Sequence, residues 1–265
     1  MLLDISPSGL PSSAAAFQEF TVEEFSAFTT SSAARANVIR HTRLVEMSWC
    51  GGSYHKYLIL AFKNTNGDTL YVRVERDFYP RSWKGVASIV KPDVRNCKDT
   101  VRVSQHRISL EDKGSNLEKW TLRFDEETQN SAISLVDLVR LLKSIRTCAP
   151  GYSLPTTNCQ WFAITIWSAF ANTAQSSCVS SEGRVEQSKM VTLRLRAMVA
   201  TASAREATNV LGWAGLVDAC ALGAAPAGAI PFGLLVCTGF LVLGVTSSVQ
   251  RQLTANVLRA FETIK

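Results

Sequence analysis

The chain has 265 residues, of which 46% are hydrophobic and 19% charged, and its net charge is +6. The basic residues are spread through stretches of mixed charge and do not form a basic block interleaved with aromatic residues, which argues against a nucleic-acid partner. The seven cysteines lack paired short spacings, so neither a zinc module nor a disulfide framework is indicated, and we expect no metal and no cofactor.

Residues 1–40 are predicted to form a polar N-terminal segment that contains one short helix. Its first 14 residues are rich in Ser and Pro, which is typical of disorder. Thr21 and Glu24 have the spacing of a capping box, with Phe25 and Phe28 on one side of the turns that follow. The helix is expected to be either a docking element or a frayed end.

Residues 41–172 predict an α+β domain, with a small antiparallel sheet packed on helices. The residues that connect 63 to 70 include Asn66-Gly67, a pair typical of a hairpin turn. We read 79–100 as a connection, and Ser134 as the start of a helix that ends near Ile145. The predicted strands have extended periodicity and cover residues 43–49, 55–63, 70–76, 101–108 and 119–124.

The segment 152–170, YSLPTTNCQWFAITIWSAF, places an Asn-Cys pair where a second helix is expected to begin. Thr157 and Gln160 have capping-box spacing, which predicts Thr157 as the N-cap and puts Cys159 in the first turn. The backbone N–H groups and the helix dipole at this end favour a thiolate, the nucleophilic form of cysteine. An alternative is ordinary core packing, since Cys159 shares a helical face with Phe162 and Ile166.

A cysteine nucleophile needs a base and a group that orients the base. Of the three histidines, His55 is the best candidate, because it begins a strand directly after the glycine turn at 50–53. Glu75 on the neighbouring strand is the candidate orienting residue. The alternatives are a surface position for His55 and a solvated ion pair of Glu75 with Arg73 or Arg76.

The order of these features, a strand beginning with His, a second strand with a polar residue and a late helix that opens with Asn-Cys, resembles the lecithin retinol acyltransferase family. The Asn-Cys helix is also similar to that of uncharacterised proteins from mushroom-forming fungi. The resemblance covers about residues 50–170 and implies a permuted papain-like core of the NlpC-type clan, with Cys159 as nucleophile and His55 as base. The chain departs from the family at Gln160-Trp161 and at Lys56-Tyr57-Leu58.

The C-terminal third is predicted to hold a linker and amphipathic helix (173–209), a hydrophobic membrane segment (210–250) and a tail (251–265). No formal charge occurs from Ala219 through Gln250, and a bilayer requires about 20 apolar helical residues. Either one span near 231–249 or a hairpin is expected, whereas a pair of buried soluble helices is the alternative. The first residues do not have the pattern of a secretory signal, so we expect a membrane protein whose main domain faces the cytosol.

Together these features predict a membrane-anchored, cysteine-dependent acyltransferase or hydrolase that works through a thioester. The implied partner is membrane lipid, with a lipid acyl ester as the favoured substrate, and the sequence does not indicate protein partners. Several members of the similar family end in a hydrophobic anchoring helix, as this chain is predicted to do. The alternative is a non-catalytic membrane protein whose cytosolic domain binds a partner.

Overall fold

The structure is a computed structural model, and the predictions for 1–14, 79–93 and 206–231 lie outside its described residues. Those residues are 17–30, 41–52, 55–78, 94–112, 120–124, 133–153, 156–171, 177–180, 185–187, 189–203, 205 and 232–263.

An antiparallel sheet with the strand order β1-β5-β4-β3-β2-β6-β7-β8 forms the centre of the fold. It confirms the α+β class, and it is larger than the small sheet that the sequence predicts. The strands are β1 (Gln18–Thr21), β2 (Arg43–Cys50), β3 (Tyr57–Lys63), β4 (Thr69–Phe78), β5 (Cys97–Ser104), β6 (Trp120–Arg123), β7 (Ser177–Ser180) and β8 (Val185–Gln187).

The hairpin of β3 and β4 is confirmed. Leu58 pairs with Val74, and at the turn the Asp68 amide donates to the Asn64 side chain over 2.8 Å. Gly67 has a φ of 90°, a conformation that glycine adopts without steric cost. The two faces of the hairpin, which periodicity left unassigned, differ in what covers them: Leu58 and Val74 lie in the main core, whereas Tyr57 lies in a small cluster on the other face.

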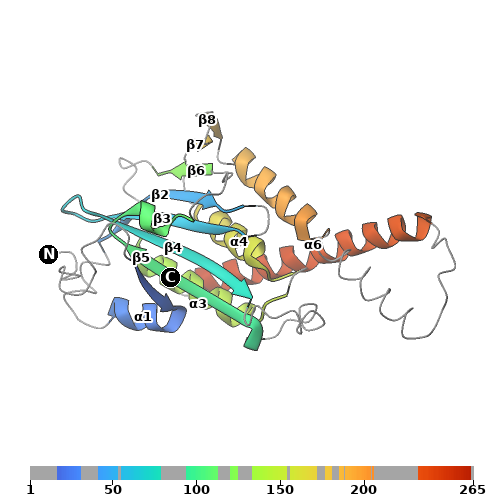
Figure 1. The fold of residues 1–265 in the computed structure, drawn as a ribbon, viewed down its shortest axis with the longest axis horizontal. Coiled ribbons are helices and arrows are strands. Elements are labelled where there is room, and N and C mark those ends of the chain that lie inside the picture. Colours follow the sequence, from blue (N-terminus) through green and yellow to red (C-terminus); the bar gives the residue numbers. More distant parts are fainter. Residues whose placement is uncertain are drawn as a thin grey trace.

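Helices cover the core face of the sheet, and Figure 1 shows α3 and α4 running behind the strands. On the opposite face, the short 3-10 helix η3 (Arg107–Leu110) contributes Leu110 to the small cluster. The helices are α1 (Val22–Thr30), α3 (Leu135–Cys148), α4 (Cys159–Ala171) and α6 (Phe232–Thr263), and residues 189–203 are also helical.

The capping box predicted at the start of α1 is present, and the structure adds a second one at Ser134, where the sequence predicted the start of a helix. Thr21 and Glu24 exchange side-chain and backbone hydrogen bonds at the start of α1, and Ser134 and Asp137 do the same at α3. The helix α1 is not a frayed end, because Phe25 is buried in the main core. Strand β1, directly before it, pairs with β5 and makes this segment part of the domain.

Two segments differ from the sequence prediction, one in its strand boundaries and one in its secondary structure. Strand β5 begins at Cys97 and ends at Ser104, so it includes the end of the predicted connection and excludes Ile108, which belongs to η3. The region after α4, predicted as a loop or linker, contributes β7 and β8, which extend the sheet from β6. These segments become strands because their backbones pair with an available strand edge. A short polar sequence has no pattern that predicts such pairing.

The prediction of a membrane segment and of membrane localisation is wrong. Among the described residues, no helix combines the length and apolarity needed to cross a bilayer. The end of α6 instead packs into the domain, because Val257 and Phe261 are buried in the main core and Trp161 donates to the Gln250 carbonyl. These side chains fill space between α6 and the other helices, and that packing accounts for their apolar character.

Candidate active site

The first turn of α4 presents Cys159, which is the first residue of the helix. The predicted cap is wrong by one residue: Asn158 is the capping residue, since its side-chain oxygen accepts from the Trp161 amide over 2.8 Å. Thr157 instead donates its hydroxyl to the Gly151 carbonyl. The actual cap puts the cysteine at the first helical position, where the amide groups have no partner within their own helix.

We expect Asn158→Ala to lower the free energy of unfolding by about 1 to 2 kcal/mol, because the Trp161 amide loses its acceptor. The same variant should slow alkylation of Cys159 by iodoacetamide, measured by peptide mass spectrometry. Ser134→Ala is the matched control, since it removes the equivalent cap of α3. It should cost similar stability and leave Cys159 alkylation unchanged; equal slowing in both variants would contradict a local role for Asn158.

His55 lies just before β3 and is held there by the glycine turn. Gly51 has a φ of 117°, and a Cβ at this position would collide with the backbone carbonyl oxygen of His55. The Lys56 ammonium donates to the Gly51 carbonyl over 3.1 Å and fixes the other side of the loop. The turn therefore requires glycine both for its backbone conformation and for its close approach to His55.

The side chains of Cys159 and Glu75 both form hydrogen bonds with the His55 ring. The bond with Glu75 joins Nε2 and Oε2 over 2.9 Å. Each ring nitrogen has one in-plane hydrogen-bonding site, which leaves Nδ1 for the sulfur. The structure thus brings the three predicted site residues together, although they come from α4, from the loop before β3 and from β4.

Electrostatics favour a charged His55. Burial opposes the charge, but the hydrogen bonds to Cys159 and Glu75 outweigh it and raise the pKa of His55 from 6.5 to about 10. The imidazole side chain is 32% exposed, whereas Cys159 is only 4% exposed. Of the two groups, the imidazole is therefore the one that solvent reaches more easily.

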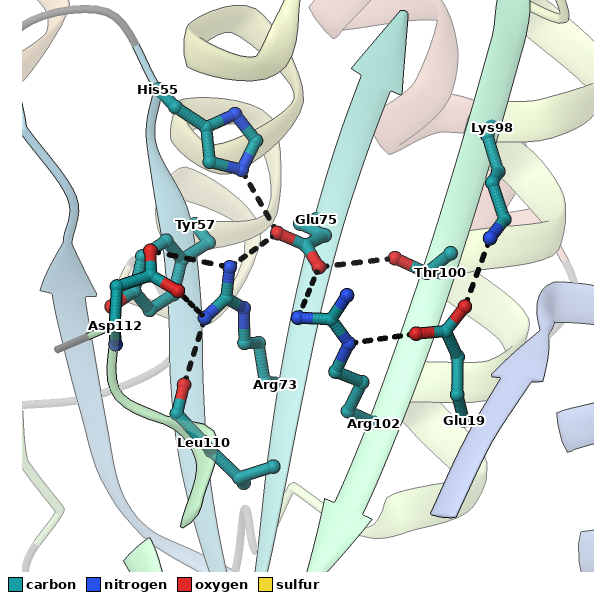
Figure 2. A network of polar contacts seen from close by, with 10 residues as sticks. All are labelled: Glu19, His55, Tyr57, Arg73, Glu75, Lys98, Thr100, Arg102, Leu110 and Asp112. Carbon is teal, nitrogen blue, oxygen red and sulfur yellow. Dashed lines mark hydrogen bonds and ion pairs between the residues drawn. The ribbon is translucent and has the colours of Figure 1, made fainter. Parts of the chain in front are cut away.

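Glu75 is buried and accepts hydrogen bonds on both oxygens, as Figure 2 shows. Oε2 accepts from His55 and, over 2.6 Å, from Arg73; Oε1 accepts from Thr100 and lies 3.1 Å from Arg102. Burial raises the pKa of this carboxyl, but His55 and the two arginines lower it more, to about 2. Glu75 consequently stays ionised at neutral pH.

The structure separates the alternatives that the sequence left open. Arg73 does pair with Glu75, but the pair is buried, with side-chain exposures of 5% and 6%, and is not solvated. Arg76 lies on the opposite face of β4 and pairs with Asp99. Strand alternation contained this information, since residues 73 and 75 share a face and residue 76 does not.

Cys159 differs from its neighbours on the same face of α4. Phe162 and Ile166 belong to the main core cluster, whereas Cys159 belongs to neither apolar cluster formed by the described residues. The other two histidines, His41 and His106, are exposed. Among the described histidines, His55 is therefore the one that the fold places at the thiol.

Sequence reasoning did not identify the residues that surround Glu75 from other strands. Thr100 and Arg102 lie on β5, and Asp112, which follows η3, pairs with Arg73 over 2.7 Å. Their polar character is ordinary for strand and loop residues, so no local signal distinguishes them. The described residues contain no group of three or more His, Cys, Asp or Glu side chains arranged to hold a metal ion.

Comparison of the chain with protein-family models, with curated proteins and with solved structures found no match.

Proposed function

We propose that this chain is a cysteine-dependent acyltransferase or hydrolase that acts through a thioester on Cys159. The observation that carries the proposal is the hydrogen-bonded series Cys159, His55 and Glu75, in which a thiol at a helix start meets a base and the base meets a carboxylate. This is the arrangement that activates a cysteine nucleophile. A permuted papain-like core is part of the proposal, supported by the order of His55 before Cys159 and by the packing of α4 on the sheet.

In the first half of the reaction, the Cys159 sulfur attacks the carbonyl carbon of an acyl ester or amide. The carbon–heteroatom bond then breaks, and the His55 imidazolium gives its proton to the leaving alcohol or amine. In the second half, neutral His55 removes a proton from water or an acceptor. The acceptor attacks the thioester, and the sulfur leaves as thiolate while His55 keeps the proton.

Three features of the site support these roles. Glu75 stays ionised and fixes the His55 ring, so that the ring nitrogen faces the sulfur. Amide groups at the start of α4 are suited to stabilise the oxyanion of the tetrahedral intermediate. The lipid ester expected from the sequence depended on a membrane segment, so the proposal names only the acyl ester or amide bond.

The test uses p-nitrophenyl butyrate as an activated acyl donor. We expect release of p-nitrophenolate and a butyryl group on Cys159, found by intact-protein and peptide mass spectrometry. Cys159→Ala should lose both signals, and Cys148→Ala, which changes a half-buried cysteine elsewhere, should keep them. An absence of acylation in the wild type, or equal acylation of Cys159→Ala, would favour a non-catalytic protein.

A further inference from the structure

Glu75 Oε2 receives hydrogen bonds from two cationic side chains at once. The His55 Nε2 atom lies 2.9 Å from it and the Arg73 guanidinium 2.6 Å from it. Figure 2 shows both donors converging on the same oxygen, His55 from the loop before β3 and Arg73 from β4. Whatever holds Arg73 therefore also determines how Glu75 meets the imidazole.

Arg73 is held on several sides and has little freedom to move. Its guanidinium donates to the Leu110 carbonyl and to the Asp112 carboxylate, and it lies over the Tyr57 ring at 3.6 Å from the ring centre. The Tyr57 hydroxyl in turn accepts from the Asp112 amide over 3.2 Å. Arginine suits this position because its planar group stacks on an aromatic ring while donating in several directions.

We propose that Arg73 is a positioning residue of the site: by sharing Glu75 Oε2 with His55, it fixes the carboxylate and limits how strongly the carboxylate holds the imidazolium proton. The inference rests on the proposed function, since it assigns Arg73 a role in the proton transfers of His55. A base that binds its proton too tightly donates it slowly to a leaving group. At neutral pH such a base is already protonated, so it rarely accepts a proton from water or an acceptor.

The sign of the expected effect follows from the charges around the site. His55 faces Cys159 and Glu75. Glu75 faces His55, Arg73, Arg102 and Thr100. Arg73 faces Glu75, Asp112 and Tyr57. Removing the Arg73 charge leaves Oε2 to His55 alone and leaves Asp112 less neutralised. Both changes favour the imidazolium, so the pKa of His55 should rise.

The experiment titrates the His55 ring by NMR in the full chain, with Arg73→Met as the test variant because methionine keeps much of the side-chain volume. We expect the titration midpoint of His55 to rise by roughly one pH unit. Arg73→Lys, which keeps the charge, should return the midpoint toward the wild-type value. Arg102→Met is the matched control: it removes a cation from the other oxygen, Oε1, and should shift the midpoint less.

An unchanged or lower midpoint in a folded Arg73→Met protein would overturn the proposal, as would an equal shift in Arg102→Met. If Arg73→Met does not fold, the folded Arg73→Lys protein decides. Lysine cannot match the flat geometry of the guanidinium, so p-nitrophenyl butyrate turnover should fall several-fold while the His55 midpoint changes little. Wild-type turnover in that lysine variant would also overturn the proposal. The NMR readout does not require catalysis, so a wild type without acylation would refute only the proposed function.

Discussion

Replacing His55 with Ala is expected to slow both the acylation and the iodoacetamide alkylation of Cys159 by roughly 10²- to 10⁴-fold at neutral pH. The physical reason is the loss of the imidazole, the hydrogen-bonding partner that takes the thiol proton. Rates would be measured from the time course of modified peptide in mass spectra, with the other cysteines of the chain as internal references.

Two variants make the result specific to the site. Glu75→Gln keeps an acceptor oxygen but removes the charge, so it should slow the reactions less than the loss of the base itself. His106→Ala changes an exposed histidine and should have no effect. Alkylation of Cys159 at the wild-type rate in His55→Ala would show that the imidazole does not activate the sulfur.

Asp99→Asn is expected to cause the largest loss of stability, about 3 to 5 kcal/mol in the free energy of unfolding. Arg76 and Asp99 form a bidentate ion pair, in which the guanidinium donates to the two carboxylate oxygens over 2.7 and 2.8 Å. The two side chains are 0% and 1% exposed. Without the Asp99 charge, the Arg76 guanidinium remains buried and uncompensated, and its Nη1 atom already has no hydrogen-bond partner among the described residues. Urea unfolding followed by circular dichroism measures the change.

The matched control lies at the surface. Glu23 pairs with Arg146 over 2.6 Å, but the side chains are 61% and 38% exposed, so Glu23→Gln should cost less than about 1 kcal/mol. The double variant Arg76→Met, Asp99→Leu removes both charges and should recover most of the lost stability. A small effect of Asp99→Asn, similar to that of Glu23→Gln, would contradict the argument from burial.

The buried pair also bears on the site, because it lies beneath the first turn of α4. The Arg76 guanidinium carbon is 5.5 Å from the Trp161 ring centre and 5.2 Å from that of Phe162. Both aromatic residues follow Cys159 within one helical turn. A cation over these rings stabilises the position of the helix start, beyond what apolar packing alone supplies.

Local signals in the sequence were sufficient for most elements near the site. The Asn-Gly turn with alternating flanks predicted the β3–β4 hairpin, capping spacing predicted the start of α1, and the apolar stripe that follows Ser134 predicted α3. Capping spacing gave the wrong cap, by one residue, at α4, where Thr157 and Gln160 match the capping pattern by chance. Asn158 caps the helix because its side-chain oxygen accepts from the Trp161 amide, whereas the Thr157 hydroxyl donates to the Gly151 carbonyl.

Hydropathy alone misled the prediction for the C-terminal third. A long uncharged stretch has the same appearance whether lipid or protein covers it, since both remove apolar side chains from water. Val257 and Phe261, which follow that stretch in the predicted tail, are buried in the main core, so the end of α6 uses protein contacts. The sequence holds no signal that separates these two environments at a single helix face.

By itself, the sequence determined the α+β class, the hairpin that carries Glu75 and the choice of Cys159, His55 and Glu75 as candidate residues, because periodicity, turns and side-chain chemistry are local properties. Only the tertiary structure decided that these three side chains meet, that Arg73 shares the Glu75 oxygen with His55, and that Asp99 neutralises Arg76 in the interior. Arg73 and Glu75 are two positions apart on β4, but the other contacts join residues 20 to more than 100 positions apart. The pairing of strands and the packing of α4 on the sheet bring those residues within reach.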